Sequence, residues 1–185
     1  MKRVLQLFLA STLFLVATAY TIQAVISWKI DSEKAMVKFT LKAHGQDMVG
    51  NFKGAKGDVK FDANDLSRSS INCTIDIATI NTGIEARDKH LQAKVFFDAA
   101  SSPVGRFSSE KIEKTKDGYM VSGKLFLKET TKDVSIPFSF EGTALDGVFK
   151  GSFIIKRSDY NIGKPDDEIG DDVTIALEIP VSRID

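Results

Sequence analysis

The sequence predicts an all-β, antiparallel fold of about eight strands with one short helical insertion. After residue 24, apolar and polar residues alternate along most of the chain, which is typical of strands that bury one face. Turn residues separate these runs at hairpin spacing, and Asp146-Gly147 is the strongest hairpin signal. Only residues 82–98 form a long stretch without alternation. Because a parallel sheet needs repeated crossover helices, we expect neighbouring strands to pair antiparallel.

The alternation divides the chain into strand-like runs separated by turns. The run over residues 48–61 carries Gly50, Gly54 and Gly57, and glycines inside a strand often mark the bends that a small barrel needs to close. A sandwich and a barrel both fit this pattern; a barrel of about eight strands has room for side chains or for one small ligand. The predicted strands cover residues 35–42, 48–61, 71–80, 106–114, 119–127, 134–140, 149–155 and 173–181, and alternation is poor in the fourth.

The segment over residues 82–98 has the features of a short helix. Thr82 and Glu85 fit a capping box at its start. Ile84 and Leu91 would share one helix face and could pack on the sheet or close the end of a barrel. The apolar residues 95–97 follow as a plug. The segment also holds the densest polar cluster of the chain, formed by Glu85, Arg87, Asp88 and His90.

Residues 1–24 have the pattern of a signal peptide, with a basic start, an apolar stretch and small residues before the cleavage site. Cleavage is expected after Ala19 or Ala24. An uncleaved anchor is the alternative, since a membrane span needs about 20 predominantly apolar residues. The remaining residues 25–185 form one domain, expected in the periplasm or secreted.

Composition argues against several classes of function. The formal net charge is zero, so bulk electrostatics gives no reason to expect a nucleic-acid partner. The chain has no motif for a nucleophile elbow, a phosphate loop or a dinucleotide site, and with one cysteine and two histidines it is not expected to be an enzyme. No cofactor or metal is expected, and the acidic residues 166–172 are interpreted as a solvated loop rather than a calcium site. Cys73 is interpreted as a small buried residue.

Arg157 is the most informative charged residue. Alternation places it inward at the end of its strand, where a guanidinium needs partners. It either forms a structural ion pair with Asp88 or Asp159, or binds a ligand head group such as a phosphate or carboxylate. Arg87 has the same two interpretations, and its neighbour Asp88 is expected to have a different partner because adjacent helical residues diverge.

Short motifs occur in a fixed order along the chain. They are Trp28-Lys29-Ile30-Asp31, Gly50-Asn51-Phe52, Thr82-Gly83, Arg87-Asp88, His90-Leu91, Phe96-Phe97-Asp98, Gly123-Lys124-Leu125 and Arg157-Ser158-Asp159-Tyr160-Asn161-Ile162-Gly163. In this order and spacing they resemble the YceI-like family of bacterial polyisoprenoid-binding, lipocalin-like periplasmic proteins. The last motif departs from the family pattern by the insertion of Asn161. The resemblance extends over essentially the whole chain after the leader.

This resemblance implies an extended, antiparallel, eight-stranded lipocalin-like barrel with an apolar interior. It also implies an exported protein that holds a long apolar chain, such as a polyisoprenoid, a quinone tail, or a fatty acid or amide, for carriage or sequestration in the cell envelope. Arg157 and Arg87, with Asp88 and His90, would either bind the head group or form structural ion pairs. The expected apolar wall consists of Phe39, Leu41, Ile75, Leu125, Phe138, Phe153 and Leu177.

Two other functions fit the same residues. A barrel filled by its own side chains would be a structural or stress-response interaction module without a small ligand. An enzyme acting on a lipid-like substrate would need an acid or base that reaches the interior, for which His90 with Asp88 is the candidate pair. The sequence leaves open transient contact with a membrane and formation of a homodimer.

Overall fold

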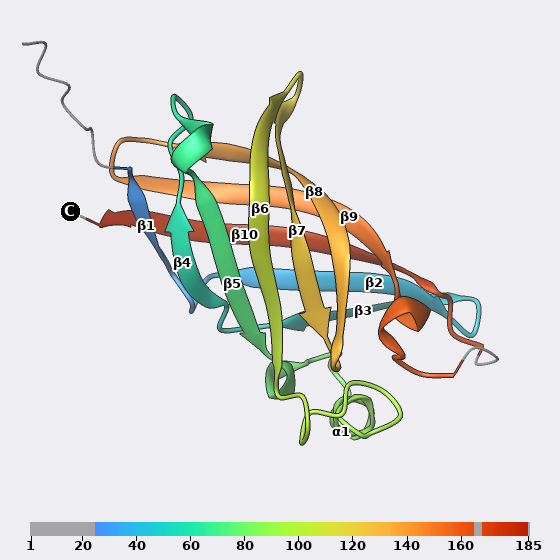
Figure 1. Ribbon diagram of the computed structural model, residues 1–185. Helices are drawn as coiled ribbons and strands as arrows, with labels where there is room; N and C mark the ends of the chain where they lie inside the picture. Colours follow the sequence, from blue (N-terminus) through green and yellow to red (C-terminus); the bar gives the residue numbers. More distant parts are fainter. Residues whose placement is uncertain (1–24, 165–167, 185) are drawn as a thin grey trace, which may run out of the picture.

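The computed structural model describes residues 25–164 and 168–184 as a β-barrel (Figure 1). Within these residues, no helix has the length and apolar character needed to cross a membrane. The predicted signal peptide lies outside the described residues. The strands are β1 (Ser27–Ile30), β2 (Met36–Ala43), β3 (Gln46–Phe52), β4 (Lys56–Lys60), β5 (Ser70–Asp76), β6 (Val104–Thr115), β7 (Gly118–Leu127), β8 (Thr130–Gly142), β9 (Asp146–Lys156) and β10 (Asp172–Ile184).

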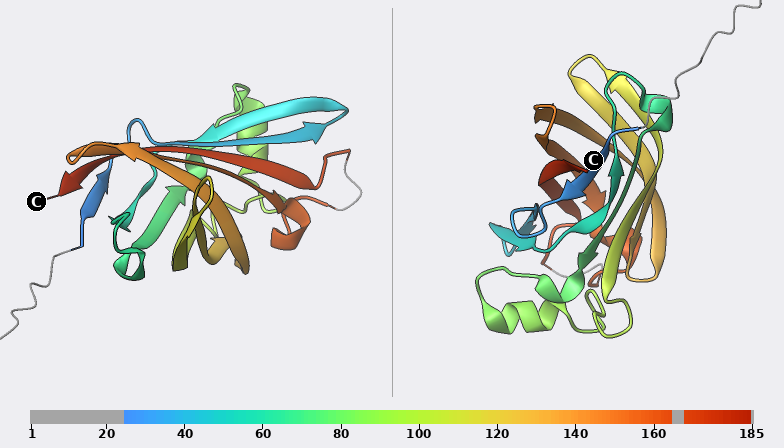
Figure 2. Two further views of the ribbon diagram at one scale, coloured as in Figure 1. Left: turned by 90° about the horizontal axis from the view of Figure 1, so that it is seen from above. Right: turned by 90° about the vertical axis from the view of Figure 1, so that its left-hand side faces the viewer.

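The described strands form one antiparallel sheet in the order β1-β4-β5-β6-β7-β8-β9-β10-β2-β3, and a further pairing of β1 with β10 closes it. Along one edge, β10 pairs with β9; along the other, it pairs with β2 in its first half and with β1 at its end. Thus β1 and β2 share one strand position, and β3 and β4 share the next. The predicted eight-stranded antiparallel barrel is confirmed, with the β2–β3 hairpin extending beyond the closed ring (Figure 2).

Several strand boundaries differ from the prediction. The run 48–61 is broken because the chain bends at Gly54, whose φ of +71° favours glycine. The third predicted strand stops at Asp76, where the 3₁₀ helix η2 (Ile77–Thr79) begins. The poor alternation of the fourth run has a physical cause, since a register shift between Ser109 and Lys111 interrupts β6.

One end of the barrel is filled by aromatic side chains. Phe61 is buried at its centre, and the indole Nε1 of Trp28 donates a hydrogen bond to the Phe61 carbonyl oxygen at 2.9 Å. Edge-on and tilted ring contacts of this kind add to the gain from burying the rings. The rings that pack around Phe61, with centroids 5.1–5.8 Å away, are those of Tyr119, Phe138, Phe140 and Phe149.

The other end carries the β2–β3 and β7–β8 turns, the β9–β10 loop with η3 (Arg157–Tyr160), and the segment between β5 and β6 with α1 (Glu85–Leu91). Figure 1 shows α1 below the end of β5 and the start of β6, far from the start of β1 and the end of β10. A short polar connection between β4 and β5 includes η1 (Leu66–Arg68).

The predicted helix is shorter than expected and starts differently. Its N-cap is Ile84, which makes no side-chain capping bond and is 52% exposed, so the capping box and the shared Ile84–Leu91 face are wrong. Thr82 lies outside the helix and binds a side chain of it instead. Of the predicted plug over residues 95–97, Phe96 is buried and Phe97 is half-buried, but Val95 is exposed. Leu91 of the helix is buried as well.

Candidate functional site: an apolar cavity in the barrel

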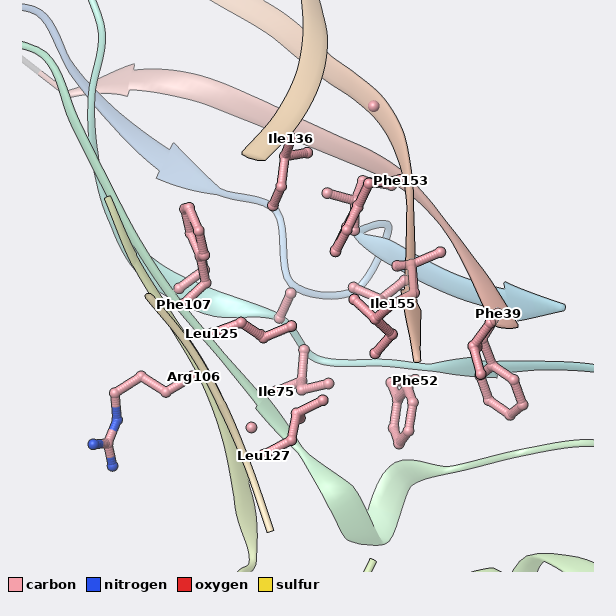
Figure 3. A pocket seen from close by; sticks show the side chains of 18 of the residues that line it. Phe39, Phe52, Ile75, Arg106, Phe107, Leu125, Leu127, Ile136, Phe153 and Ile155 are labelled. Carbon is pink, nitrogen blue, oxygen red and sulfur yellow. The ribbon is translucent and has the colours of Figure 1, made fainter. Parts of the chain in front are cut away.

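A cavity of about 220 Å³ lies inside the barrel. It extends from the filled aromatic end towards α1, whose Leu91 is part of its lining together with Phe96 and Phe97 from the following loop. Strand residues form the rest of the wall, and Figure 3 shows Ile75, Leu125 and Leu127 opposite Phe153 and Ile155. All residues predicted for the wall line this cavity: Phe39, Leu41, Ile75, Leu125, Phe138, Phe153 and Leu177.

Four inward residues of the cavity wall are less buried than neighbouring core residues such as Phe39 and Leu41. Ile75, Leu125, Phe153 and Leu177 are only half-buried, although their strands place them inside. Their exposed surface faces the hollow. The alternative of a barrel filled throughout therefore holds for the aromatic end but not for the end near α1.

Three charged residues, Arg106, Lys150 and Arg157, belong to the cavity lining, and their charged groups contact other parts of the protein. The side chain of Arg106 points away from the cavity (Figure 3), and its guanidinium lies 5.4 Å from the ring centroid of Phe126. The Nζ of Lys150 lies 3.0 Å from a carboxylate oxygen of Glu141. Burial raises the pKa of the Cys73 thiol to about 11, and this side chain behaves as an apolar part of the wall. The cavity therefore offers its contents hydrocarbon surface and almost no charge.

Arg157 is buried, as its alternation predicts, but its partners differ from those expected. It binds neither Asp88 nor Asp159. Instead, its guanidinium donates hydrogen bonds at 2.8–3.1 Å to four backbone carbonyl oxygens of the β9–β10 loop. A residue with this arrangement fixes the loop beside the cavity. The accepting carbonyls belong to Ile162, Lys164, Ile169 and Gly170.

Arg87, Asp88 and His90 do not line the cavity. The carboxylate of Asp88 accepts hydrogen bonds from the Thr82 N–H at 2.8 Å and the Thr82 hydroxyl at 2.5 Å. Arg87 also binds Thr82, at its hydroxyl and carbonyl oxygens, so the two side chains meet at one residue and the expectation of separate partners is wrong. His90 is exposed and contacts the ring of Phe96. These groups hold the segment that covers the barrel end.

The β9–β10 loop is also tied to the β2–β3 turn. His44 and Glu168 are joined by a backbone hydrogen bond of 2.9 Å and a side-chain contact of 2.7 Å. The carboxylate of Asp171 accepts hydrogen bonds from the N–H and hydroxyl of Ser158, and these bonds lower its pKa.

Residues 165–167 of the predicted acidic loop lie outside the described residues. Among those described, no three His, Cys, Asp or Glu side chains gather in a way that could hold a metal ion.

A second hollow, of about 270 Å³, lies where β8 and β9 separate. Their pairing ends at Phe138 opposite Gly151; beyond it β8 continues with β7 and β9 with β10, and Figure 1 shows the two strands diverging. Pro137 has no N–H to donate at this point. The alternation could not predict this gap, because it indicates which face a residue occupies but not where pairing stops. The hollow is lined by Lys132, Asp133, Val134, Ile154, Ile155, Lys156, Asp159, Tyr160 and Asp172.

A model of the YceI-like domain matches residues 28–181. The chain belongs to the YceI-like family. A UPF0312 protein of Yersinia pestis (strain Pestoides F) is 31% identical to it over 170 residues, which cover 87% of this chain and 86% of the relative. A UPF0312 protein of Photorhabdus laumondii is 31% identical over 144 residues, or 73% of this chain and 75% of the relative.

Several solved structures share the barrel. The crystal structure of Burkholderia cenocepacia BcnA matches with a TM-score of 0.76 and 29% identity, covering 82% of this YceI-like chain and 98% of BcnA. The Campylobacter jejuni YCEI protein matches with a TM-score of 0.70 and 27% identity, over 76% and 87% of the two chains. A polyisoprenoid binding domain from Saccharophagus degradans has a TM-score of 0.65 at 14% identity, over 86% and 99%, and is similar in fold.

Proposed function

We propose that this YceI-like protein binds one long apolar chain in the barrel cavity and carries or sequesters it in the cell envelope. The expected ligands are a polyisoprenoid, a quinone tail, or a fatty acid or amide. The observation that carries the proposal is the apolar cavity, which lacks a charged group directed into it. The likeness in fold to the polyisoprenoid binding domain from Saccharophagus degradans also supports the proposal.

The size of the cavity limits what it holds without rearrangement. An apolar cavity of about 150 Å³ accommodates benzene, so a cavity of about 220 Å³ has room for a chain segment of roughly ten carbon atoms, or about two isoprene units. Each buried CH₂ group contributes about 0.8 kcal/mol, so ten of them give roughly 8 kcal/mol before association costs, and a micromolar dissociation constant is the upper limit of affinity for such a segment. A longer chain must displace wall side chains or extend outside the barrel.

Export is part of the proposal and depends on the signal-peptide pattern of residues 1–24. A protein with that pattern would meet its lipid in the periplasm or outside the cell.

Binding is favoured over catalysis because the candidate acid–base pair, His90 with Asp88, is absent from the cavity lining. An interaction module with no ligand would require the hollow half of the barrel to fill.

The proposal is tested with two tryptophan variants at neighbouring positions of β10. Ile175 is half-buried and lines the cavity, whereas Ala176 is exposed on the outer face. The indole of Ile175→Trp would displace about three chain carbons, so we expect roughly 50-fold weaker binding, while Ala176→Trp should bind as the wild type does.

The measurement is native mass spectrometry of the protein from its own host envelope, followed by lipid extraction and titration with isoprenoid and fatty acyl chains. A stoichiometric hydrocarbon that Ile175→Trp loses and Ala176→Trp retains would support the proposal. A wild-type protein that carries no lipid and takes up none of the offered chains would overturn it, as would equal binding by the two variants.

A further inference from the structure

The hollow between β8 and β9 adjoins the barrel cavity, because the two spaces share a lining residue. Ile155 lines both spaces. Val134, across the gap on β8, lines the hollow and packs against the buried cores at both ends of the barrel. Rotation of these two side chains would join the hollow to the cavity without breaking any strand pairing, because β8 and β9 are not paired there.

Tyr160 of η3 contributes to the lining of this hollow and has an unsatisfied polar group. The residue is 1% exposed, and its hydroxyl has no hydrogen-bond partner among the residues that the structure describes. A buried hydroxyl without a partner is unfavourable and rare in folded proteins. Burial raises the pKa of Tyr160 to about 12, so the hydroxyl remains a proton donor at physiological pH. The group lacks an acceptor.

The charges around the hollow indicate what kind of acceptor fits. Three aspartates and two lysines line it. Lys132 lies 3.9 Å from the carboxylate of Asp159, and Lys156 lies 3.3 Å from that of Asp172. The third aspartate, Asp133, pairs with Lys124 at 2.5 Å. Because both lysines of the lining already lie beside carboxylates, a phosphate or a free carboxylate would find no unpaired cation there and would have to compete with the aspartates. A neutral oxygen acceptor would not.

We propose that the hollow between β8 and β9 holds a neutral, carbonyl-bearing head group, which accepts a hydrogen bond from the Tyr160 hydroxyl while its apolar chain passes between Val134 and Ile155 into the cavity. This inference rests on the proposed function and adds the class of ligand. Quinones, amides and esters have such a carbonyl. Chains that end in a phosphate or a free carboxylate are disfavoured.

The test compares Tyr160→Phe with the wild type, because this change removes only the hydroxyl. The probes share one geranyl chain, which has the two isoprene units that the cavity can hold, and end in a methyl ketone, a phosphate or a hydrogen atom. We expect the wild type to bind the ketone more tightly than the phosphate. Loss of one hydrogen bond should weaken ketone binding by Tyr160→Phe about fivefold and leave hydrocarbon binding unchanged. The melting temperature of the variant should equal or exceed that of the wild type.

A second variant tests the role of charge. Asp159→Asn removes one negative charge from the lining of the hollow. It should strengthen binding of the phosphate probe severalfold and leave the affinity for the ketone probe unchanged. If the hydrocarbon probe itself fails to bind, the proposed function is wrong. If all chains bind but Tyr160→Phe and Asp159→Asn leave the order of affinities unchanged, only the head-group assignment is overturned.

Discussion

Replacing Arg157 by methionine should destabilise the protein strongly, because it leaves four loop carbonyls without their donor. Methionine retains an unbranched apolar side chain but no hydrogen-bond donor. Each carbonyl left unpaired should cost about 1 kcal/mol, the low end of the range for buried groups, since part of the loop can regain water. The four carbonyls together therefore account for a loss of about 4 kcal/mol. For a domain of this size we expect the melting temperature to fall by roughly 12 °C.

Arg106 provides the matched control. It is exposed and contacts the ring of Phe126, an interaction worth about 0.5–1 kcal/mol at a surface site. We expect Arg106→Met to lower the melting temperature by no more than about 3 °C. Thermal and urea unfolding measure the two changes, and hydrogen exchange of the β9–β10 loop amides shows whether Arg157→Met opens that loop first. Equal stability of the two variants would refute the role of Arg157 in fixing the β9–β10 loop.

The same pair separates the two roles considered for Arg157. If the residue fixes the loop, a chain ending in a phosphate should bind folded Arg157→Met about as well as it binds the wild type. A stable Arg157→Met protein that selectively loses phosphate-bearing chains would instead make Arg157 a ligand of the head group.

Two further predictions concern the cavity wall and the helix. The Cys73 thiol should react very slowly with a water-soluble disulfide reagent at pH 8, with the rate rising as pH approaches about 11, and a bound chain should protect it further. Because the folded pKa is raised, the stability that this thiol contributes is complete below about pH 9 and is lost between about pH 9 and 11. The free energy of unfolding of Cys73→Ala should not show this loss between about pH 9 and 11. An identical pH dependence of unfolding in both proteins would contradict the prediction. Asp88→Ala should destabilise α1 by about 2 kcal/mol, because the N–H and hydroxyl of Thr82 lose their acceptor. The control Glu85→Ala removes only an exposed ion pair with Lys89 and should cost about 0.4 kcal/mol. Hydrogen exchange of the helix amides distinguishes these variants, and equal exchange in both would refute the role of Asp88.

Alternation was sufficient to predict which residues face the interior. Phe153 and Leu177 lie on different strands, yet the two-residue period of each strand places both on the cavity wall. The sequence could not decide between a hollow and a filled barrel, because the same inward residues occur in both. Whether Leu125 faces a cavity or another side chain depends on how far the strands diverge, and that depends on pairing rather than on local pattern.

Partners of polar side chains were harder to predict, because charges do not always pair with charges. The alternation of its strand predicted the inward position of Arg157. Its acceptors, however, are backbone carbonyls of a loop, which no residue type identifies. Thr82 and Glu85 fit a capping pattern, but a third side chain, Asp88, binds Thr82 from within the helix and replaces the expected contact. In both cases a loop conformation that depends on tertiary packing decides which group is within reach.

The hollow half of the barrel has an energetic consequence that bears on function. Unfilled apolar space costs about 24 cal/mol per Å³, so a cavity of about 220 Å³ corresponds to roughly 5 kcal/mol of forgone stability. That is comparable to the whole free energy of unfolding of many domains, which lies at about 5–15 kcal/mol. The same barrel fills its other end with phenylalanine rings around Phe61, so its geometry does not prevent side chains from occupying the interior. A hydrocarbon chain in the cavity would restore the missing contacts. The empty space is therefore easier to explain as room for a ligand than as a defect of packing.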